Sequence, residues 1–456
     1  MMHSKVRISV LSLATILSFR MLGLFMILPV FSLYVKTIPH ATPFLIGLAL
    51  GIYGLTQACL QIPFGMLSDR IGRKVVIATG LILFALGSIV AALSSSIYGI
   101  ILGRALQGTG AIGSATLAMI ADLTKNEDRS KAMAVVGLVI GCSFALAMIL
   151  GPSINTWFQL KGIFWTTTAL AGAGMVLLYT TVSTPPHLLA HPEVGDKQGK
   201  FKTIFKNTQL LRLNLGIFIL HSMLTAMFIA IPILLSHVMQ LDEHRQILLY
   251  FIVLALAFFI MLPFIIIAEK KRQMKIIFTT AIALLILTQL MLLKFQHAAI
   301  SIGMILLLFF TAFTLLEACL PSLISKISPI YNKGTAMGIY SSSQFLGIFV
   351  GGSLGGWLLG HYQTTGIFIF CAILGGIWFA AAITMAPPPY LSTLVVDIKD
   401  IHSTHFDKLC QQLNNMPGVA EVALMLNESL LYLKVDKKII QEDELRKMIR
   451  QSNLHF

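Results

Sequence analysis

The stretch Pro63–Ile77, PFGMLSDRIGRKVVI, places an Asp, two Arg and a Lys within six positions of an otherwise apolar chain. The whole chain has 456 residues, of which 56% are hydrophobic and only 11% are charged. Charged residues make up about a quarter of an ordinary soluble domain, so this composition is typical of a membrane protein. We therefore expect the charged stretch to be a loop between two membrane spans.

Twelve apolar segments are long enough to cross a membrane, because about 20 helical residues span a hydrocarbon core of about 30 Å. They cover residues 8–34, 43–66, 75–93, 97–120, 132–154, 162–182, 211–236, 246–267, 276–293, 298–323, 334–360 and 364–386. The polar, Lys-rich segment 183–210 is expected to be a linker that divides them six and six. The predicted fold is an all-α membrane protein with two pseudo-symmetric six-helix bundles, at 1–182 and 211–388.

Basic residues predict the orientation of the spans. Lys and Arg are concentrated in the loops on the side of the N-terminus, whereas the other side offers only Lys36, Lys161, Arg245 and Lys294. Loops rich in Lys and Arg stay in the cytoplasm, so both termini are expected there, in a bacterial inner membrane. The net charge of +14 has the same origin. Nucleic-acid binding would require this charge to cluster on a soluble surface, so we expect no nucleic acid among the partners.

The two halves of the chain resemble each other. Pro63–Arg70 has a counterpart in Pro263–Lys270, and Arg129–Met133 has one in Lys333–Met337. Both similarities fall at matching places in the six-plus-six plan. A repeated six-helix unit is the architecture of transporters in which one half rocks against the other.

After Pro387–Pro389 the pattern becomes that of a soluble module, expected over residues 390–456. Strands are predicted at 391–398, 419–425 and 430–435, and helices at 403–414 and 442–451. This order indicates a small α+β domain of the ferredoxin-like kind. His402 and His405 form an HxxH pair, but the five Cys are scattered without a CxxC motif, so we expect no metal site. A regulatory contact or a partner interface is the favoured role of the module.

A basic loop that sets the topology explains the Arg and Lys of the opening stretch but not the spacing of its glycines and its acid. Gly65 permits close helix approach, and Gly72 permits a turn with positive φ. The spacing is carried by Gly65, Asp69, Arg70, Gly72, Arg73 and Lys74. It resembles the signature G-x-x-x-D-R-x-G-R-[RK] of the major facilitator superfamily. The resemblance implies a conformational latch in which this stretch acts together with Asp122, at the end of the fourth span.

Further stretches resemble other signatures of this family. LGRALQGTGAIG (Leu102–Gly113) resembles its helix-four motif through Arg104, Gln107, Gly108 and Gly110. GLVIGCSFALAMILGPS (Gly137–Ser153) resembles the helix-five motif of drug–proton antiporters through Gly137, Gly141, Gly151 and Pro152, although Ser153-Ile154-Asn155 stand where further Gly is usual. Residues 20–31, 317–326 and 342–357 resemble the YajR-like branch, whose members carry a C-terminal ferredoxin-like domain. The resemblance supplies no substrate.

Few ionisable side chains lie inside the spans, so each one is a candidate for function. Glu317, in TLLEACLP, can bind and release a proton as its surroundings alternate, and His221 is its natural partner because histidine changes charge near neutral pH. For both, a structural hydrogen bond is the alternative. The resemblance implies a coupling or switching role for Arg104. Arg20 is expected to contact either the substrate or Glu317, unless it serves helix packing.

These observations predict a secondary active transporter that exports small apolar or cationic compounds in exchange for protons. The residues that suit its cavity are Arg20, Phe25, Met26, Tyr53, Phe228 and Tyr340, although core or lipid contact also explains each aromatic side chain. The alternatives are a proton-coupled carrier for uptake or efflux of a metabolite, and a membrane sensor. An enzyme is not expected, because no nucleophile–base pair or phosphate loop occurs. We expect a monomer without a cofactor, with protons, a small molecule and the bilayer as its partners.

Overall fold

The computed structural model describes residues 4–124, 126–183, 204, 206–296, 299–329, 333–387, 392–397, 406–425, 430–436, 439, 440 and 445. Nine helices in this part of the chain are long and apolar enough to cross a membrane. Two of them fold back on themselves, and one further span consists of two shorter helices. The predicted all-α architecture of twelve spans is thereby confirmed.

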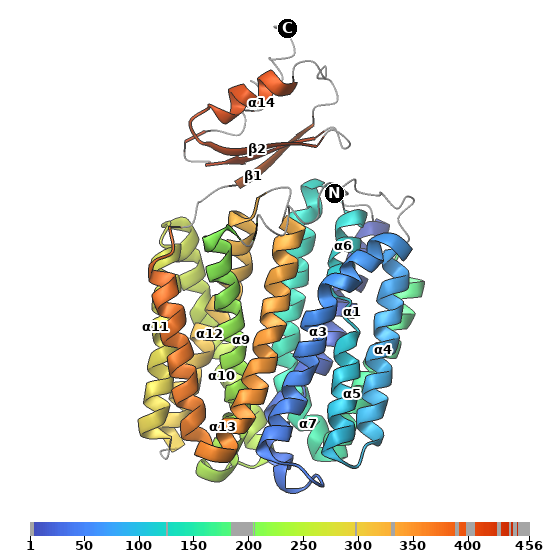
Figure 1. The fold of residues 1–456 in the computed structure, drawn as a ribbon, viewed down its shortest axis with the longest axis vertical. Coiled ribbons are helices and arrows are strands. Elements are labelled where there is room, and N and C mark those ends of the chain that lie inside the picture. Colours follow the sequence, from blue (N-terminus) through green and yellow to red (C-terminus); the bar gives the residue numbers. More distant parts are fainter. Residues whose placement is uncertain are drawn as a thin grey trace.

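The helices of the first half follow one another with short connections (Figure 1). In chain order they are α1 (Ser4–Phe25), α2 (Leu28–Phe31), η1 (Ser32–Lys36), α3 (Pro43–Ile71), α4 (Arg73–Leu93), α5 (Ile97–Thr109), α6 (Gly113–Leu123) and α7 (Asn126–Thr180). The first predicted span consists of α1 with α2 and η1 as its continuation.

The fourth span was predicted as one helix over residues 97–120, and this is wrong, because the span breaks between α5 and α6. The break falls in the sequence GTGAIG, in which glycine is a poor helix former. Close packing also requires glycine there, because a Cβ on Gly110 would lie 2.4 Å from the carbonyl oxygen of Gly80 on α4.

α7 is a hairpin of two spans rather than one long helix. Its backbone reverses at Gln159, which has a φ of 55°. One arm runs beside α1, where Ser143 forms a hydrogen bond with Ser18. The other arm returns along α1 and ends near Thr181, which donates a hydrogen bond to Ser12 at 2.6 Å. These arms are the predicted fifth and sixth spans.

The second half repeats this plan. Its helices are α9 (Thr208–Ile233), the π-helical turn η2 (Leu234–Val238), α10 (Glu243–Lys270), α11 (Met274–Phe295), α12 (Ala299–Ile327) and α13 (Lys333–Ile383). α13 is again a hairpin, and its backbone reverses at Gln363 with a φ of 54°.

The backbone of three connections supports a duplicated six-helix unit. Positive φ is uncommon for residues other than glycine, yet it occurs at matching places in both halves. The pairs are His40 and Gln240, Gly72 and Arg272, and Gln159 and Gln363. The similarity predicted from short sequence matches therefore extends to the conformation of the turns.

α3 and the first arm of α13 join the two halves along a line of small residues (Figure 1). A Cβ on Gly47 would lie 2.2 Å from the carbonyl oxygen of Gly352. Further along, Ser342 Oγ donates to the carbonyl oxygen of Ala58 at 3.2 Å. Closer to the start of α13, a Cβ on Gly338 would meet open space. The described contacts between α3 and α13 thus run from Gly47 and Gly352 to Ala58 and Ser342.

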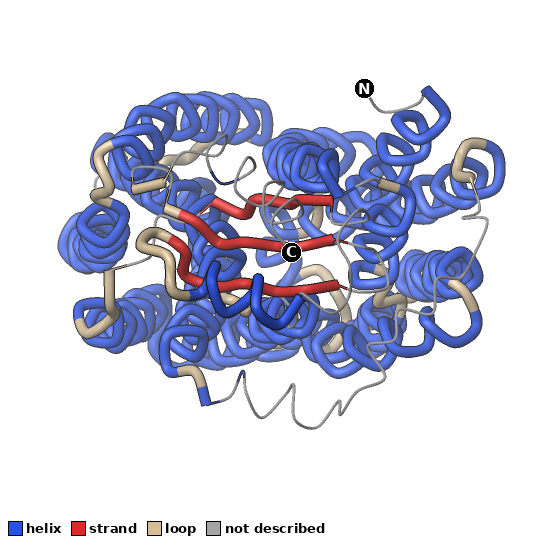
Figure 2. The backbone as a smooth tube through the Cα atoms, turned by 90° about the horizontal axis from the view of Figure 1, so that it is seen from above, coloured by secondary structure: helices blue, strands red, loops and turns tan. Residues whose placement is uncertain are grey.

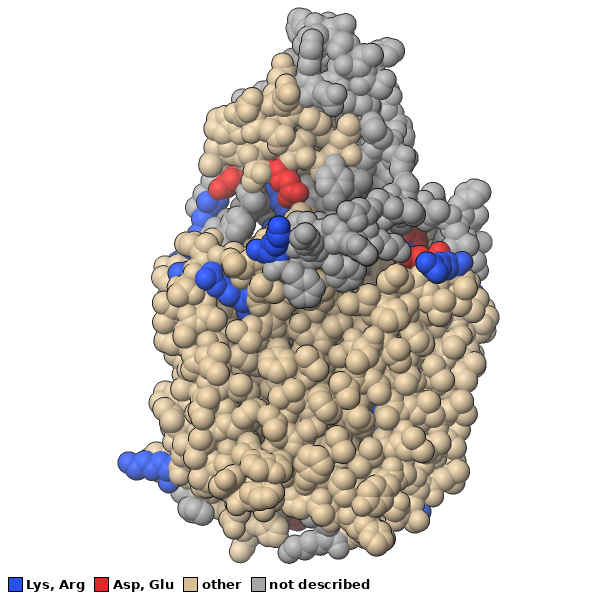
Figure 3. All heavy atoms as spheres, in the orientation of Figure 1, with Lys and Arg blue, Asp and Glu red and all other residues tan. Residues whose placement is uncertain are grey.

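The N-terminus and the appended module lie at the same end of the spans, which we call the module end (Figure 1). The face of the spans seen in Figure 3 shows almost no charged side chains in its middle zone. Charged groups lie near the two ends, as expected of a bundle surrounded by lipid.

The module consists of β1 (Ser392–Asp397), α14 (Phe406–Asn414), β2 (Val419–Met425) and β3 (Leu430–Val435). Its antiparallel sheet has the order β1-β3-β2, and Figure 2 shows the strands side by side from above. This is the predicted ferredoxin-like arrangement. The sheet lies between α14 and the spans (Figure 1). The predicted helix 442–451 apart from Leu445, the pair His402 and His405, and most of the linker lie outside the described residues.

Candidate functional site

The interior of the second half holds an acid–histidine pair, Glu317 on α12 and His221 on α9. Glu317 Oε2 lies 3.8 Å from His221 Nε2. The same histidine nitrogen lies 2.8 Å from Nε2 of Gln344 on α13. Because 3.8 Å exceeds a hydrogen-bond distance, Glu317 and His221 interact electrostatically. A proton gained or lost by either group changes this interaction, and the structure brings together two residues that the sequence singled out separately.

Glu317 also faces the space between the two halves. Its side chain is 36% exposed, although its Oε2 is enclosed. Phe313, one turn earlier on the same face of α12, packs against Phe144 of α7 with ring centroids 5.9 Å apart. Since α7 belongs to the first half, this face of α12 is directed at the other half rather than at lipid. Rocking of the halves would therefore change the exposure of the carboxyl group to water.

The interior of the first half holds a buried arginine. Arg20 on α1 is 1% exposed, and its Nη2 donates to Oε1 of Gln57 on α3. Its guanidinium carbon lies 5.8 Å from the ring centre of Tyr53, within cation–π range. Its Nε and Nη1 have no hydrogen-bond partner among the described residues. Two donors on a desolvated cation are thus available to an acceptor that enters this site.

The helix-four motif forms a hydrogen-bond network inside the first half. Arg104 on α5 is fully buried and donates from Nε to the carbonyl oxygen of Ala49 at 3.2 Å and from Nη1 to Gln107 Oε1 at 2.9 Å. Gln107 Nε2 in turn donates to Ser88 on α4 at 2.7 Å. A Cβ on Gly108 would lie 2.3 Å from a backbone oxygen of α3. The motif therefore holds α3, α4 and α5 together.

The residues of the helix-five motif divide into two groups. A Cβ on Gly151 would lie 2.1 Å from the carbonyl oxygen of Met26, so Gly151-Pro152 marks a close approach of α7 to the end of α1. Met26 itself is completely buried in this contact. A Cβ on Gly137 or Gly141 would have no neighbour within 4 Å, so close packing does not explain these two glycines.

Aromatic rings from both halves meet near the acid–histidine pair. The ring of Phe144 lies 5.0 Å from that of Phe25 on α1, and it also approaches Phe228 on α9 at 6.4 Å. Two of the predicted cavity residues, Phe25 and Phe228, therefore contact one ring from the two different halves. The contact surface here is apolar.

Two other predicted cavity residues lie at the same junction. Tyr53 on α3 approaches Phe345 on α13, with ring centroids 6.3 Å apart. Tyr340 is 4% exposed and is an electrostatic neighbour of Glu317. Its hydroxyl has no hydrogen-bond partner among the described residues. Within those residues no group of three or more His, Cys, Asp or Glu could hold a metal ion.

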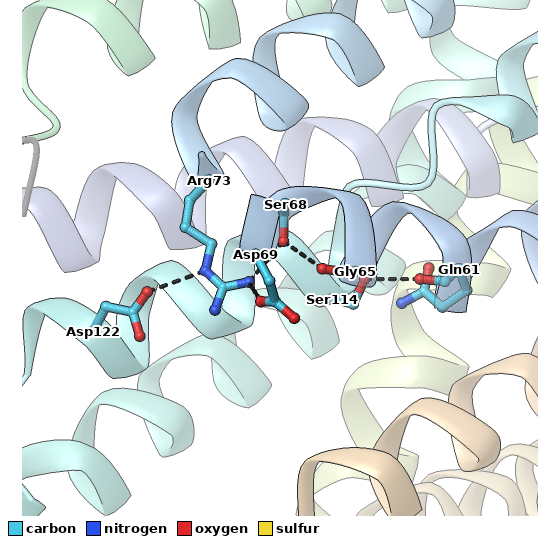
Figure 4. Close-up of polar contacts among 7 residues, drawn as sticks. All are labelled: Gln61, Gly65, Ser68, Asp69, Arg73, Ser114 and Asp122. Carbon is cyan, nitrogen blue, oxygen red and sulfur yellow. Dashed lines mark hydrogen bonds and ion pairs between the residues drawn. The ribbon is translucent and has the colours of Figure 1, made fainter. Parts of the chain in front are cut away.

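The charged stretch of the first half forms a connected set of polar contacts at the module end (Figure 4). Arg73 Nε donates to Oδ2 of Asp122 at 3.1 Å, and its Nη1 donates to Asp69 and, at 2.7 Å, to Ser68. Gly72, with a φ of 101°, turns the chain between α3 and α4 so that Arg73 can reach both acids. Arg73 is thus the basic residue of the loop that pairs with Asp122, whereas Arg70 is exposed.

Further contacts tie this latch to its neighbours. Ser114 Oγ donates to the carbonyl oxygen of Gln61 at 2.9 Å, and a Cβ on Gly65 would lie 3.0 Å from that hydroxyl (Figure 4). Lys74 Nζ donates to the carbonyl oxygen of Val182 at 2.9 Å. The latch therefore connects α3, α4 and α6 with the end of α7.

Comparison with known proteins identifies the family of this chain. The family model of the Major Facilitator Superfamily matches residues 13–329 and 275–404. The chain belongs to this superfamily. It is 44% identical over 441 residues to the inner membrane transport protein YajR of Escherichia coli (strain K12), and the match covers 96% of each chain. An uncharacterized transporter of Buchnera aphidicola subsp. Baizongia pistaciae is 37% identical over 82% of this chain and 96% of its own.

Solved structures show the same fold at low identity. The D-xylose–proton symporter superposes with a TM-score of 0.67 at 18% identity, over 83% of this chain and 98% of that structure. The human organic anion transporter MFSD10 has a TM-score of 0.61 at 18% identity, over 83% and 100%. The predictions of the superfamily, of the similarity to YajR and of a transporter rather than an enzyme are confirmed.

Several residues of the site were missed from the sequence. Phe144 and Phe313 are ordinary apolar residues of a span, and Gln57 and Gln344 are uncharged, so no local pattern marks them. A search for side chains one turn from Glu317 would have found Phe313, because residues four apart share a helix face.

Proposed function

We propose that this protein exports small apolar or cationic compounds in exchange for protons, with Glu317 as the proton carrier. The observation that carries this proposal is the place of Glu317, which is 36% exposed between the two halves and 3.8 Å from His221. An ionisable group inside the spans is costly unless it has a function. A carboxyl group between moving halves is suited to bind a proton from one side and release it to the other.

Alternating access supplies the movement. The close contact of Gly47 with Gly352, at the end remote from the module, supports a state in which the halves at 1–182 and 211–388 are closed at that end and open at the module end. Rocking about the contact between α3 and α13 would close the module end and open the other. The Lys and Arg of the loops support placement of the module end and both termini in the bacterial cytoplasm. The protein then acts as a monomer, with 183–210 as linker and 390–456 as the appended module.

The cargo class follows from the apolar junction. Phe25, Phe144, Phe228 and Phe313 offer ring faces and edges to an apolar molecule, and ring faces also attract cations. The helix-five motif, with Gly151-Pro152 packed against α1, favours the drug–proton antiporter type. Antiport requires that proton and cargo do not occupy the site together, so protonation of Glu317 should weaken binding of a cation.

The test is proton movement in everted membrane vesicles, followed with a pH-gradient dye while a panel of cationic and neutral compounds is added. We expect collapse of the gradient by wild type and none by Glu317→Gln. Asp242→Asn is the matched control, because it removes an exposed carboxylate outside the junction and asparagine still caps α10. Wild-type behaviour of Glu317→Gln would overturn the role of this residue, and no response of wild type to any compound would overturn drug export.

A second candidate is a proton-coupled carrier of an anionic metabolite, and the buried arginines favour it. Arg20 and Arg104 both lie over the ring of Tyr53, at 5.8 and 4.9 Å. A desolvated guanidinium is costly unless it is paired, and a carboxylate or phosphate on the cargo would accept from the free Nε and Nη1 of Arg20. Organic acids added to the same assay separate the candidates: a response to acids alone, lost in Arg20→Gln, would establish the carrier.

A further inference from the structure

The turn between α10 and α11 is the counterpart of the latch turn between α3 and α4. Glu269 stands where the first half has Asp69, and both follow a Pro-Phe pair in the preceding helix. Arg272 has a φ of 56° and stands where Gly72 has a φ of 101°. An arginine with a left-handed backbone thus occupies the second turn, and its side chain leaves from a different position than that of Arg73.

The acid that faces this arginine comes from the appended module. Both terminal nitrogens of Arg272 donate to the carboxylate of Asp436, with Nη1 2.9 Å from Oδ2. A two-point contact between a guanidinium and a carboxylate is among the stronger charged interactions. The pair is also partly shielded, because the side chains of Arg272 and Asp436 are 32% and 16% exposed. In the first half the corresponding acid, Asp122, comes from the transmembrane helix α6.

The position of Asp436 is fixed by the fold of the module. It follows directly after β3, and its backbone N–H donates to the carbonyl oxygen of Gly418 at 2.8 Å. Its own carbonyl oxygen accepts from Ile439 and Ile440 at 2.9 and 3.1 Å. The carboxylate is therefore held by the folded module and is not a random contact of a loose tail.

A second contact joins the same strand to another span. Lys434 on β3 is only 7% exposed, and its Nζ donates to the carbonyl oxygen of Ser328 at 2.6 Å. Ser328 follows the last residue of α12, where helix carbonyl groups lack partners within the helix and favour a positive charge. Leu431 and Leu433 belong to the core of the module, so the alternation of a strand directs Lys434 to the opposite face, toward the spans.

A third pair closes the arrangement within the spans. Lys326 near the end of α12 forms an ion pair with Glu269 at the end of α10. The α10–α11 turn, the end of α12 and strand β3 are thus linked in a closed triangle. In the described part of the first half, Asp69, Arg73 and Asp122 link the corresponding turn and helix end.

We propose that the module is a second latch. Asp436 and Lys434 are positioning residues that hold the module end of the second half in the arrangement seen here. Release of the module leaves the turn and the end of α12 joined, among the described contacts, by the pair of Lys326 with Glu269 alone, without the two contacts of the module, and the arrangement loses population. The occupant of this docking face is the chain's own segment 390–456. The proposal concerns the conformational cycle and does not depend on the identity of the cargo or on proton coupling.

Two distances measured by pulsed electron paramagnetic resonance on the full-length protein in lipid nanodiscs test this proposal. Spin labels on the exposed positions Thr208 and Gln411 report docking of the module, and labels on the exposed positions Ile71 and Thr208 report separation of the halves at the module end. No cargo or proton gradient is needed, so a failure here is distinct from a failure of the proposed export.

Asp436→Asn should disperse the docking distance and lower the share of the separated arrangement by at least about fivefold, the lower end of couplings between linked sites. The swap Arg272→Asp with Asp436→Arg should restore both distances. Arg245→Gln is the matched control, because it removes an arginine from an exposed ion pair with Asp242 at the start of α10. It should change neither of the two distances. Arg272→Lys, which keeps the charge but not the two-point contact, should have an intermediate effect.

Loss of docking in Asp436→Asn with an unchanged separation of the halves would overturn the latch. A swap that behaves no better than the single variant would overturn it as well. If Asp436→Asn does not fold, Lys434→Met removes the contact with Ser328 instead. The same two distances then show whether loss of docking changes the separation of the halves.

Discussion

The two halves of this transporter share their turns but distribute their charges differently. The first half keeps Arg20 and Arg104 in its interior, next to the neutral partners Gln57 and Gln107, and the described contacts of its latch are between its own helices. The second half keeps an acid in its interior, Glu317. Duplication therefore preserved the backbone at the connections, whereas the polar side chains diverged.

The difference suggests a division of work between the halves. An acid that faces the junction is suited to exchange protons, and arginines held by neutral groups are suited to bind an acceptor or to fix helices. At the module end, the two latches diverged in the same way. Asp122, which pairs with Arg73, comes from a transmembrane helix, whereas Asp436, which pairs with Arg272, comes from the appended module. Variants of matched residues in the two halves test each part of this comparison.

The largest effect is expected where the two halves meet, at the glycine contact between α3 and α13. Gly47→Ala places a Cβ 2.2 Å from the carbonyl oxygen of Gly352, and overpacking of this kind costs about 1–3 kcal/mol. The closed contact should lose at least about fivefold in population, since 1.4 kcal/mol corresponds to a factor of about 10. Transport in vesicles should fall by a similar factor.

Gly137→Ala is the control for this variant, because a Cβ there meets no neighbour within 4 Å. Equal loss of transport in both variants would show that packing between the halves does not limit the cycle.

A smaller effect is expected at the latch of the first half. Arg73→Gln removes the ion pairs with Asp69 and Asp122, of which the second is mostly shielded. The pair with Asp69 is half exposed, and charged pairs of this kind are worth up to about 1 kcal/mol, so we expect the separation of the halves at the module end to change by less than about fivefold in the spin-label measurement. Arg70→Gln, on an exposed neighbour in the same turn, should leave the separation as in wild type. A stronger effect of Arg70→Gln would contradict the assignment of the latch.

The smallest effect is expected at His221. His221→Asn keeps a polar group near Gln344 but removes the ring nitrogen 3.8 Å from Glu317. Because the proton resides on Glu317 in this account, exchange should slow a fewfold but persist, which stopped-flow measurement of proton movement can follow. His361→Asn, at an exposed histidine on α13, is the control. Complete loss of exchange in His221→Asn would move the proton to the histidine.

Much of the fold could be predicted because its signals are local. Each of these signals lies within a short stretch of sequence: a run of about 20 apolar residues, a Gly at a turn, or the alternation of a strand. The twelve spans and the strands β1 to β3 were predicted from such signals. The break between α5 and α6 was missed because glycine is tolerated in many transmembrane helices. Only the contact of Gly110 with Gly80 makes the break necessary.

The site could be predicted only where it carries charge. Glu317 and His221 stand out in apolar spans, whereas Phe144 and Gln344 do not. The contact of Arg272 with Asp436 joins distant parts of the sequence, so no spacing rule reveals it. The similarity between the two Pro-Phe stretches was the signal that could have pointed to Arg272 as the counterpart of a latch residue.

Infrared difference spectroscopy of the protein in lipid tests the central claim, that Glu317 exchanges the proton, most directly. Spectra are taken between mildly acidic and mildly alkaline buffer, and the spectrum of Glu317→Gln is subtracted from that of wild type to isolate the carboxyl stretch of this residue. Glu269→Gln, at an exposed acid, serves as the control. The protonated carboxyl band of Glu317 should appear in the acidic buffer and disappear in the alkaline buffer. A flat difference, with Glu317 in one protonation state throughout, would contradict it.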